Sequence, residues 1–237
     1  MHIISIPQTV IDNVTRARGL EHVFENFHPA TTALLVVDMQ NGFMMEEVGH
    51  SVCAMAREIV PNINRIAEAV RRTGGTVVWI QNAATEETLQ SWSIRVEMDG
   101  PERTEKRLQS MTPGSKGYQL WAGLNTNPAD LFVQKTRFSA FIQGSSNLEA
   151  DLRKRGIDTV IVTGTVTNIC CESTARDAMM RNFRTIMVTD ANAAMTDDLH
   201  NASLTAFYVR FGDIMSTDHV IRALDRNAQR ARPTAAE

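Results

Sequence analysis

The sequence predicts one α/β domain of three layers, in which helices cover both faces of a six-stranded, mainly parallel sheet. Three observations support this prediction. Six short apolar runs, rich in β-branched residues, each suit a buried strand. Helical patterns separate most of these runs, as connections between parallel strands require. The 237 residues contain no internal repeat, low-complexity tract or domain linker.

The elements follow from periodicity and from turn-forming residues. Strands are expected at 33–37, 76–80, 130–135, 160–162, 185–188 and 213–215. Helices are expected at 53–72, 148–155, 197–209, from Thr167 or Asn168 onward, and after residue 215 to about 230. Glycines close the first two helices, at Gly74-Gly75 and at Gly156.

The remaining segments have weaker patterns. Residues 1–30 are expected to form an N-terminal arm with at most a short helix, residues 31–230 the domain, and residues 231–237 a frayed tail. Residues 83–128 lack clear periodicity and should hold only short helical patches. Because so long a connection usually has a function, we expect a lid or an oligomer contact there.

Composition and charge argue against several classes of protein. A net charge of −3 and a pI near 6.1 lack the basic character of nucleic-acid binders. The first residues lack a secretory signal pattern, and no stretch approaches the roughly 20 apolar residues of a membrane-spanning helix. Three cysteines, an odd number, argue against a disulfide framework. We therefore expect a reduced, soluble, cytoplasmic protein that acts without a nucleic acid or a membrane.

Three chemically capable residues stand at the ends of predicted strands. Asp38 follows the first strand, Lys135 ends the third, and Cys170 lies just beyond the fourth, where Gly164 allows a sharp turn into a helix. Each could have an ordinary structural role alone. Because the carboxyl ends of parallel strands meet at one edge of a sheet, however, all three can converge on one crevice.

These three residue types suit nucleophilic catalysis. A thiol is mostly protonated at neutral pH, so an ammonium and a helix N-terminus near Cys170 would stabilise the thiolate. A carboxylate such as Asp38 can take the thiol proton and later give it to a leaving amine. Lys135 would compensate the charge of Asp38, as a crevice requires.

Three segments resemble the isochorismatase-like cysteine hydrolases, a likeness that covers about residues 31–220. They are Val37-Asp38-Met39-Gln40-Asn41-Gly42-Phe43, residues 135–141 and residues 164–178. The resemblance implies that Cys170, rather than Cys171, is the nucleophile, with Asp38 and Lys135 as its catalytic partners. It also implies a cis peptide bond between Thr165 and Val166. The N–H groups of Val166 and Cys170 would then form the oxyanion hole.

The chain departs from the family pattern at two places. The family often has an acidic residue at the position of Gly42, so we expect an opened corner there. Nicotinamidase-type members bind a metal through an Asp-x-His element after the second strand, where this chain reads Ile80-Gln81-Asn82-Ala83-Ala84-Thr85. The six histidines form no cluster with ligand spacing. We therefore predict no catalytic metal and no cofactor.

Within the family, these segments look most like amidohydrolases of ureido compounds, including ureidoacrylate, N-carbamoylsarcosine, biuret and triuret hydrolases. Their substrates are small, flat and rich in N–H and C=O groups. The amide side chains expected to bind such a substrate are Asn41, Gln81 and Asn82. The aromatic side chains expected as flat walls are Phe43, Trp92, Tyr118, Phe138 and Tyr208.

The sequence thus predicts a cofactor-free hydrolase of a linear C–N amide bond in a small urea-like or carbamoyl compound. Cys170 would form an acyl-thioester and ammonia would leave. Three alternatives stay open: vinyl-ether hydrolysis of an isochorismate-like acid, a non-catalytic binding member of the family, and a thiol-redox protein that uses Cys170 and Cys171. Trp92, Trp121 and the irregular region 83–128 suggest more apolar surface than one domain can cover. Because members of the family are also usually oligomers, we expect a homotetramer.

Overall fold

The computed structural model describes residues 1–231, so the predicted tail lies outside the described residues except for Ala231. The strands are β1 Thr32–Val37, β2 Thr76–Asn82, β3 Leu131–Lys135, β4 Thr159–Thr165, β5 Arg184–Ala193 and β6 Asp213–Met215. The helices are α1 Gln8–Arg18, α2 Asn41–Met44, α3 Val60–Arg72, α4 Glu86–Gln90, α5 Ser93–Met111, α6 Leu148–Lys154, α7 Glu172–Met180, α8 Asp197–Arg210 and α9 Thr217–Ala231.

The six strands form one parallel sheet in the order β3-β2-β1-β4-β5-β6. Each strand of the central pair is buried along its full length, as expected for parallel strands covered on both faces. The register places Val37 beside both Ile80 and Gly164, so the carboxyl ends of β1, β2 and β4 are level. The predicted three-layer α/β fold is confirmed.

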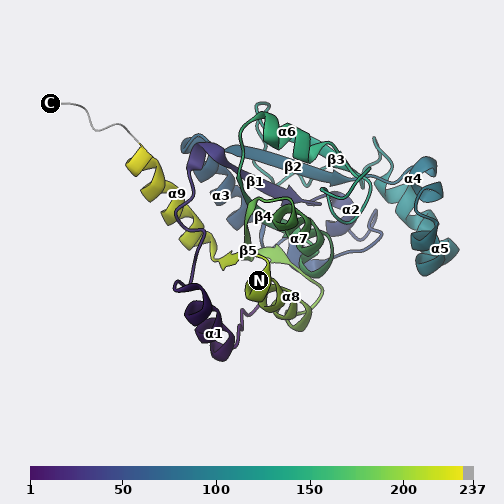
Figure 1. Cartoon of the computed structure of the whole chain (residues 1–237). Helices are drawn as coiled ribbons and strands as arrows, with labels where there is room; N and C mark the ends of the chain where they lie inside the picture. The colour runs from purple at the N-terminus through teal and green to yellow at the C-terminus, as the bar shows by residue number, and fades with distance from the viewer. Residues whose placement is uncertain (232–237) are drawn as a thin grey trace.

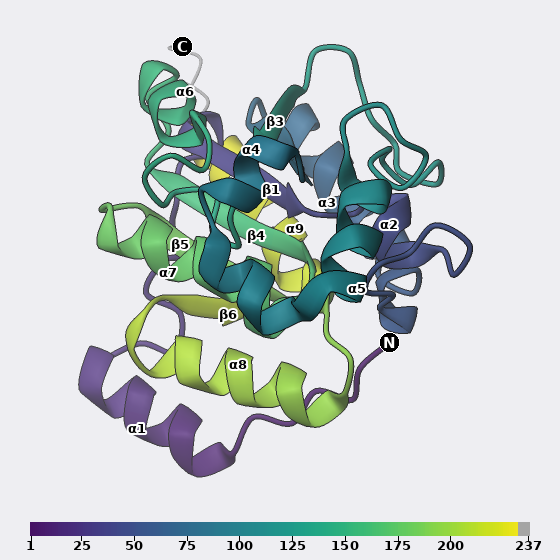
Figure 2. The same cartoon turned by 90° about the vertical axis from the view of Figure 1, so that its right-hand side faces the viewer.

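Two apolar clusters hold the helices against the sheet. Alternate residues of β1 face opposite ways: Leu34 and Val36 pack with α3 and α9, whereas Leu35 and Val37 pack with α6, α7 and α8. The α2 helix, which follows β1, and the α4 and α5 helices, which follow β2, lie at the same end of the sheet, on the right in Figure 1. In Figure 2, α4 and α5 lie in front of this end.

The expectation of short helical patches at 83–128 is wrong for α5, which spans 19 residues. Its residues Gly100 and Pro101 explain why the pattern was obscured. Gly100 has a left-handed φ of 73°, so two helical segments meet there at a kink, and Pro101 opens the second one. The α3 helix also begins later than predicted, at Val60 instead of Cys53, with Pro61 in its first turn.

The first 30 residues pack against the rest of the chain. They include the 11-residue helix α1, which lies beside α8 at the bottom of Figure 2 and buries Val14. The division into an arm, a domain and a tail stays a proposal. Among residues 1–231, none of the helices combines the length and apolar character needed to cross a bilayer.

Candidate active site

The chain turns sharply at Asp38 as it leaves β1. Asp38 has a φ of 53°, and its N–H still donates to the carbonyl of Ile80 on the neighbouring strand, at 2.9 Å. This conformation is uncommon for a residue with a side chain and is often associated with functional sites. The carboxylate is completely buried at the carboxyl edge of the sheet.

Lys135 joins Asp38 to Cys170. It ends β3 opposite Asn82, and its side chain is completely buried. Its Nζ atom lies 2.8 Å from Asp38 Oδ2, 3.5 Å from Cys170 Sγ and 3.0 Å from the carbonyl oxygen of Arg137. The three residues predicted from their places at strand ends are thus brought together around one ammonium group.

Cys170 lies in a single π-helical turn, Thr167–Cys171, which connects β4 to α7. This differs from the predicted first turn of an α-helix, because the N–H of Cys171 reaches back to Val166, five residues earlier. The peptide bond between Thr165 and Val166 is cis, where the resemblance implied one. Cys170 is 4% exposed, whereas Cys171 is fully buried and its thiol lies 3.9 Å from the carbonyl of Thr163.

Burial controls the charges in this site. It raises the pKa of Cys170 to about 12, because the nearby Lys135 only partly offsets the loss of water. Burial likewise raises the pKa of Asp38, against the opposing effect of Lys135. Although burial alone would lower it, Asp38 and Cys170 together raise the pKa of Lys135. In this closed arrangement burial therefore opposes the expected thiolate and favours a neutral thiol beside the Asp38–Lys135 pair.

Some of the predicted substrate-binding residues surround this edge. Asn82 is half-buried, and no hydrogen bond of its side chain is found within residues 1–231. Phe43 packs edge-on against His50, with ring centroids 4.8 Å apart. Trp92, which precedes α5, meets the ring of Phe138 at 5.0 Å. Asn82 ends β2, and the aromatic side chains lie in the segments after β1, β2 and β3. Two of these strands, β1 and β3, also position Asp38 and Lys135.

Others have structural partners instead. The amides of Asn41 and Gln81 donate to the carbonyl oxygens of Lys116 and Tyr118, so both brace the loop after α5. The Tyr118 hydroxyl lies 3.3 Å from Gln134 Oε1, and Gln134 neighbours Gln81 in the register of β2 and β3. Since residues alternate along a strand, Gln81 and Gln134 face away from Lys135.

The prediction for Tyr208 is wrong. Tyr208 lies near the end of α8, a helix that starts after the carboxyl end of β5 and ends just before β6 begins. Tyr208 therefore lies near the amino ends of the strands, whereas Cys170 lies at their carboxyl ends. Its ring is buried and its hydroxyl donates to the carbonyl of Glu21, at 2.8 Å. An aromatic residue at helical spacing packed as core, the commonest fate of such residues.

The expected open corner at Gly42 is also wrong. A Cβ atom at this position would lie 2.6 Å from both Met111 Sδ and Ser110 Oγ. The end of α5 therefore fills the space that we expected to be open. The glycine at position 42 allows α5 to pack closely on α2.

Two residues near the site were not predicted, Gln40 and Arg107. Gln40 is buried, and its amide joins the two loops at the sheet edge: Nε2 donates to the carbonyls of Asn82 and Tyr118, and Oε1 accepts from the Asn82 N–H. It stands inside the segment that carries the family resemblance, which could have drawn attention to it. Arg107 lies in α5, where the sequence offered no comparable signal.

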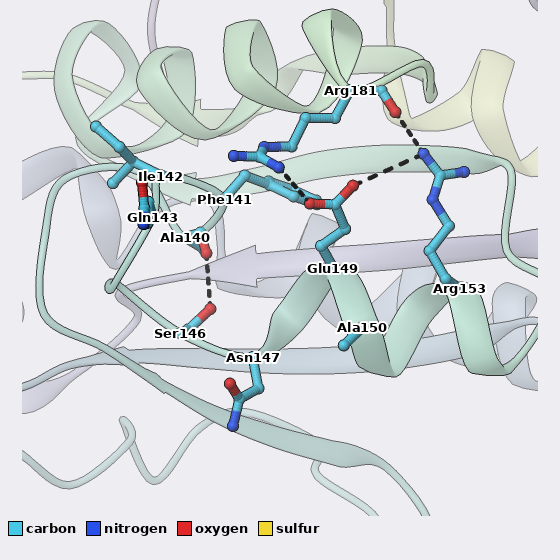
Figure 3. A pocket seen from close by; sticks show the side chains of 10 residues that line it. All are labelled: Ala140, Phe141, Ile142, Gln143, Ser146, Asn147, Glu149, Ala150, Arg153 and Arg181. Carbon is cyan, nitrogen blue, oxygen red and sulfur yellow. Dashed lines mark hydrogen bonds and ion pairs between the residues drawn. The ribbon is translucent and has the colours of Figure 1, made fainter.

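The described residues contain no group of three or more His, Cys, Asp or Glu side chains arranged to hold a metal ion. Two surface hollows are not lined by Asp38, Lys135 or Cys170. One, of about 570 Å³, lies between α6 and the end of α7, where Glu149 is paired with Arg181 (Figure 3). Another, of about 450 Å³, lies beside Trp92, Phe138 and Ser173. Of these two hollows, the second adjoins residues of the candidate site.

Known proteins match both the sequence and the fold. Residues 32–219 match the model of the isochorismatase domain. Ureidoacrylate amidohydrolase RutB of Methylobacterium radiotolerans is 32% identical over 206 residues, covering 78% of this chain and 76% of that protein. A crystal structure of a cysteine hydrolase from Pseudomonas syringae pv. phaseolicola has a TM-score of 0.73 at 28% identity, covering 85% of this chain and 96% of the other. N-carbamoylsarcosine amidase from Thermoplasma acidophilum has a TM-score of 0.64 at 29% identity, covering 79% and 97%.

Proposed function

Because the chain belongs to the isochorismatase family and is a hydrolase of C–N amide bonds, we propose that it cleaves a linear amide through a thioester on Cys170. The observation that carries this proposal is the position of Lys135 Nζ, 2.8 Å from Asp38 and 3.5 Å from the Cys170 sulfur. A binding module or a dithiol redox protein has no need of a buried carboxylate and ammonium beside one thiol.

The resting charges dictate the order of proton transfers. Asp38 takes the thiol proton while Cys170 Sγ attacks the carbonyl carbon, because a thiol with so high a pKa is a poor nucleophile until deprotonated. Asp38 then gives this proton to the departing nitrogen, which leaves as ammonia. A water molecule next attacks the thioester with its proton passing to Asp38, and the product acid and the free thiol are restored.

Lys135 keeps this cycle electrically feasible. It stays an ammonium beside Asp38 and the sulfur, so the developing thiolate has a counterion within 3.5 Å. The N–H groups of Val166 and Cys170 are proposed to stabilise the tetrahedral oxyanion. Val166 and Cys170 lie just after β4. The pairing of β4 with β1 fixes where the turn that contains them begins.

The proposed substrates are small ureido or carbamoyl compounds, the class to which biuret and triuret belong. The names of the ureidoacrylate and N-carbamoylsarcosine hydrolysing relatives support this class. The half-buried Asn82 amide, next to Lys135 in the sheet register, suits a ligand rich in N–H and C=O groups. A cytoplasmic homotetramer remains part of the proposal.

The test is an ammonia-release screen over ureas, carbamoyl amino acids and simple amides, with two matched cysteine variants. Cys170→Ala should lower kcat by at least about 10³-fold, because the nucleophile itself is lost. Cys171→Ala should keep most activity, since that thiol is buried against Thr163. Equal losses in the two variants would show that the nucleophile is misassigned. Vinyl-ether hydrolysis that survives in Cys170→Ala would favour the isochorismate-type alternative.

A further inference from the structure

Within residues 1–231, Arg107 is a buried cation without a salt-bridge partner. It is 5% exposed, and its Nε and Nη2 atoms are buried with no hydrogen-bond partner anywhere in residues 1–231. Burial lowers its pKa, and Arg95 and Arg137 lower it further. An unpaired buried guanidinium is costly, so proteins seldom keep one unless an anion binds to it.

The surroundings of Arg107 are positive overall. Its guanidinium carbon lies 5.9 Å from the ring centroid of Trp92, and that of Arg137 lies 5.1 Å from the same ring. Arg95 lies 4.7 Å from the ring of Phe138 and is paired with Asp99, the one carboxylate that influences Arg107. Arg137 contacts only neutral groups, the hydroxyl and carbonyl of Ser91 and of Thr136. One carboxylate thus stands among three guanidinium groups.

This cationic cluster, Arg95, Arg107 and Arg137, lies beside the candidate active site. Arg137 follows Lys135 by two residues, and its carbonyl accepts the Lys135 ammonium at 3.0 Å. Arg107 is one helical turn before Met111, which packs against Gly42 in the short helix α2 that follows Asp38. It also acts on His50, whose pKa burial and the arginines lower to about 4. The cluster therefore adjoins the segments that follow Asp38 and Lys135 in the chain.

We propose that Arg107 binds a carboxylate group of the substrate, so that the natural substrate is an anionic carbamoyl or ureido acid. The inference rests on the proposed amidohydrolase function and narrows its substrate class. A guanidinium fork matches a carboxylate with two parallel hydrogen bonds, and Arg107 has two free donors with which to form them. Trp92 and Phe138 provide flat apolar walls beside this charge. A neutral urea would leave Arg107 uncompensated.

Binding can be measured apart from turnover, in the full-length Cys170→Ala protein, by calorimetry. N-carbamoylglycine and N-carbamoylglycinamide have the same skeleton and differ in one negative charge. The acid should bind at least tenfold more tightly than the amide. Arg107→Gln, added to Cys170→Ala, should weaken binding of the acid roughly 10- to 100-fold, as loss of a charge-assisted hydrogen bond does, and change the amide less than threefold. The matched control is Arg103→Gln, an exposed arginine one turn earlier on α5.

Three outcomes would overturn the proposal: equal affinities for acid and amide, no detectable binding of either, or equal weakening of both by Arg107→Gln.

Light scattering of the Arg107→Gln protein tests whether a second copy of the chain supplies the anion. Loss of assembly with unchanged preference for the acid would assign the counterion to a second copy and would also overturn it. If the Arg107→Gln protein does not fold, the acid-to-amide ratio of Cys170→Ala alone decides. Tight, Arg107-dependent binding without any ammonia release by the unsubstituted protein would refute the amidohydrolase and leave the anion site standing.

Discussion

At the scale of single residues, Lys135 has the most demanding position in the molecule. It is fully buried and serves two groups at once, the Asp38 carboxylate and the Cys170 sulfur. We predict that Lys135→Ala lowers kcat at least about 10²-fold, the low end of what one preorganised electrostatic group supplies. Lys135→Arg should not restore activity, because a planar guanidinium does not fit a compact point-charge site. Steady-state kinetics test this, with Lys154→Ala on the exposed face of α6 as the control.

The same variant should change the pH dependence. Asp38 must be ionised to accept the thiol proton, and its pKa already lies above the ordinary 3.8 because of burial. Activity should therefore fall as the pH drops through this raised pKa. Removal of Lys135 takes away the main interaction that lowers the Asp38 pKa, so the acid limb of kcat/KM should move to higher pH. If Lys135→Ala turns over normally with the wild-type profile, the three-residue mechanism is wrong.

The sequence could predict which residues meet but not how water is excluded from them. Asp38, Lys135 and Cys170 each follow a strand, and parallel strands bring such positions together at one edge. The ionisation state of Cys170 depends on the side chains that pack over it, and no local pattern encodes those. Tertiary contacts also explain why three polar residues were wrongly expected to be free for a ligand. The amides of Asn41 and Gln81 donate to the loop after α5, and the Tyr118 hydroxyl contacts Gln134.

At the scale of elements, the close approach of β4 to β1 fixes the turn that carries Cys170. Gly164 has a φ of 117°, and a Cβ there would lie 2.1 Å from the carbonyl oxygen of Val37. Gly164→Ala should destabilise the protein by at least about 3 kcal/mol, because two backbones must separate. Gly156→Ala is the control: its φ is 69°, and no heavy atom lies within 4 Å of the added Cβ. It should cost about 1–2 kcal/mol, for backbone strain alone.

Urea denaturation measures this difference. The Gly164→Ala midpoint should fall clearly below that of Gly156→Ala, with ammonia release lost even where the protein remains folded. Similar midpoints for the two variants would show that β1 and β4 tolerate separation, and that Gly164 acts only through its φ.

The α5 helix could not be predicted from local sequence patterns. Its second segment contains good helix formers, but Gly100 and Pro101 break the periodicity that a single window requires. Its end is fixed by tertiary contacts: the N–H of Ala84 donates to Met111, and Ser110 donates to Val48. The place of Arg107 depends on this docking, so it could not be inferred from the sequence. The central strands β1 and β4 needed no such context, because their apolar β-branched runs already specify burial on both faces.

At the scale of the whole molecule, we predict that the chain forms a homotetramer. The two tryptophans that suggested this are half-buried within the chain, where Trp92 packs against Phe138 and Trp121 against Arg57. Another apolar surface is a better candidate for the contact between copies. It consists of Ile94 and Met98, one turn apart on α5, which are 60% and 78% exposed. The α5 helix projects beyond the sheet in Figure 1, so this surface is well placed to meet a second copy.

Light scattering at micromolar concentration should give four times the 26.4 kDa of one chain. The double substitution Ile94→Glu and Met98→Glu should lower this mass, because burying two carboxylates in an apolar contact is unfavourable. Met180→Glu provides the control, since Met180 is similarly exposed, at 64%, but stands at the end of α7. A monomer in the unsubstituted protein would refute the assembly. An unchanged mass in the double variant would show that α5 is not where the copies meet, and that α5 serves only the cationic cluster beside Lys135.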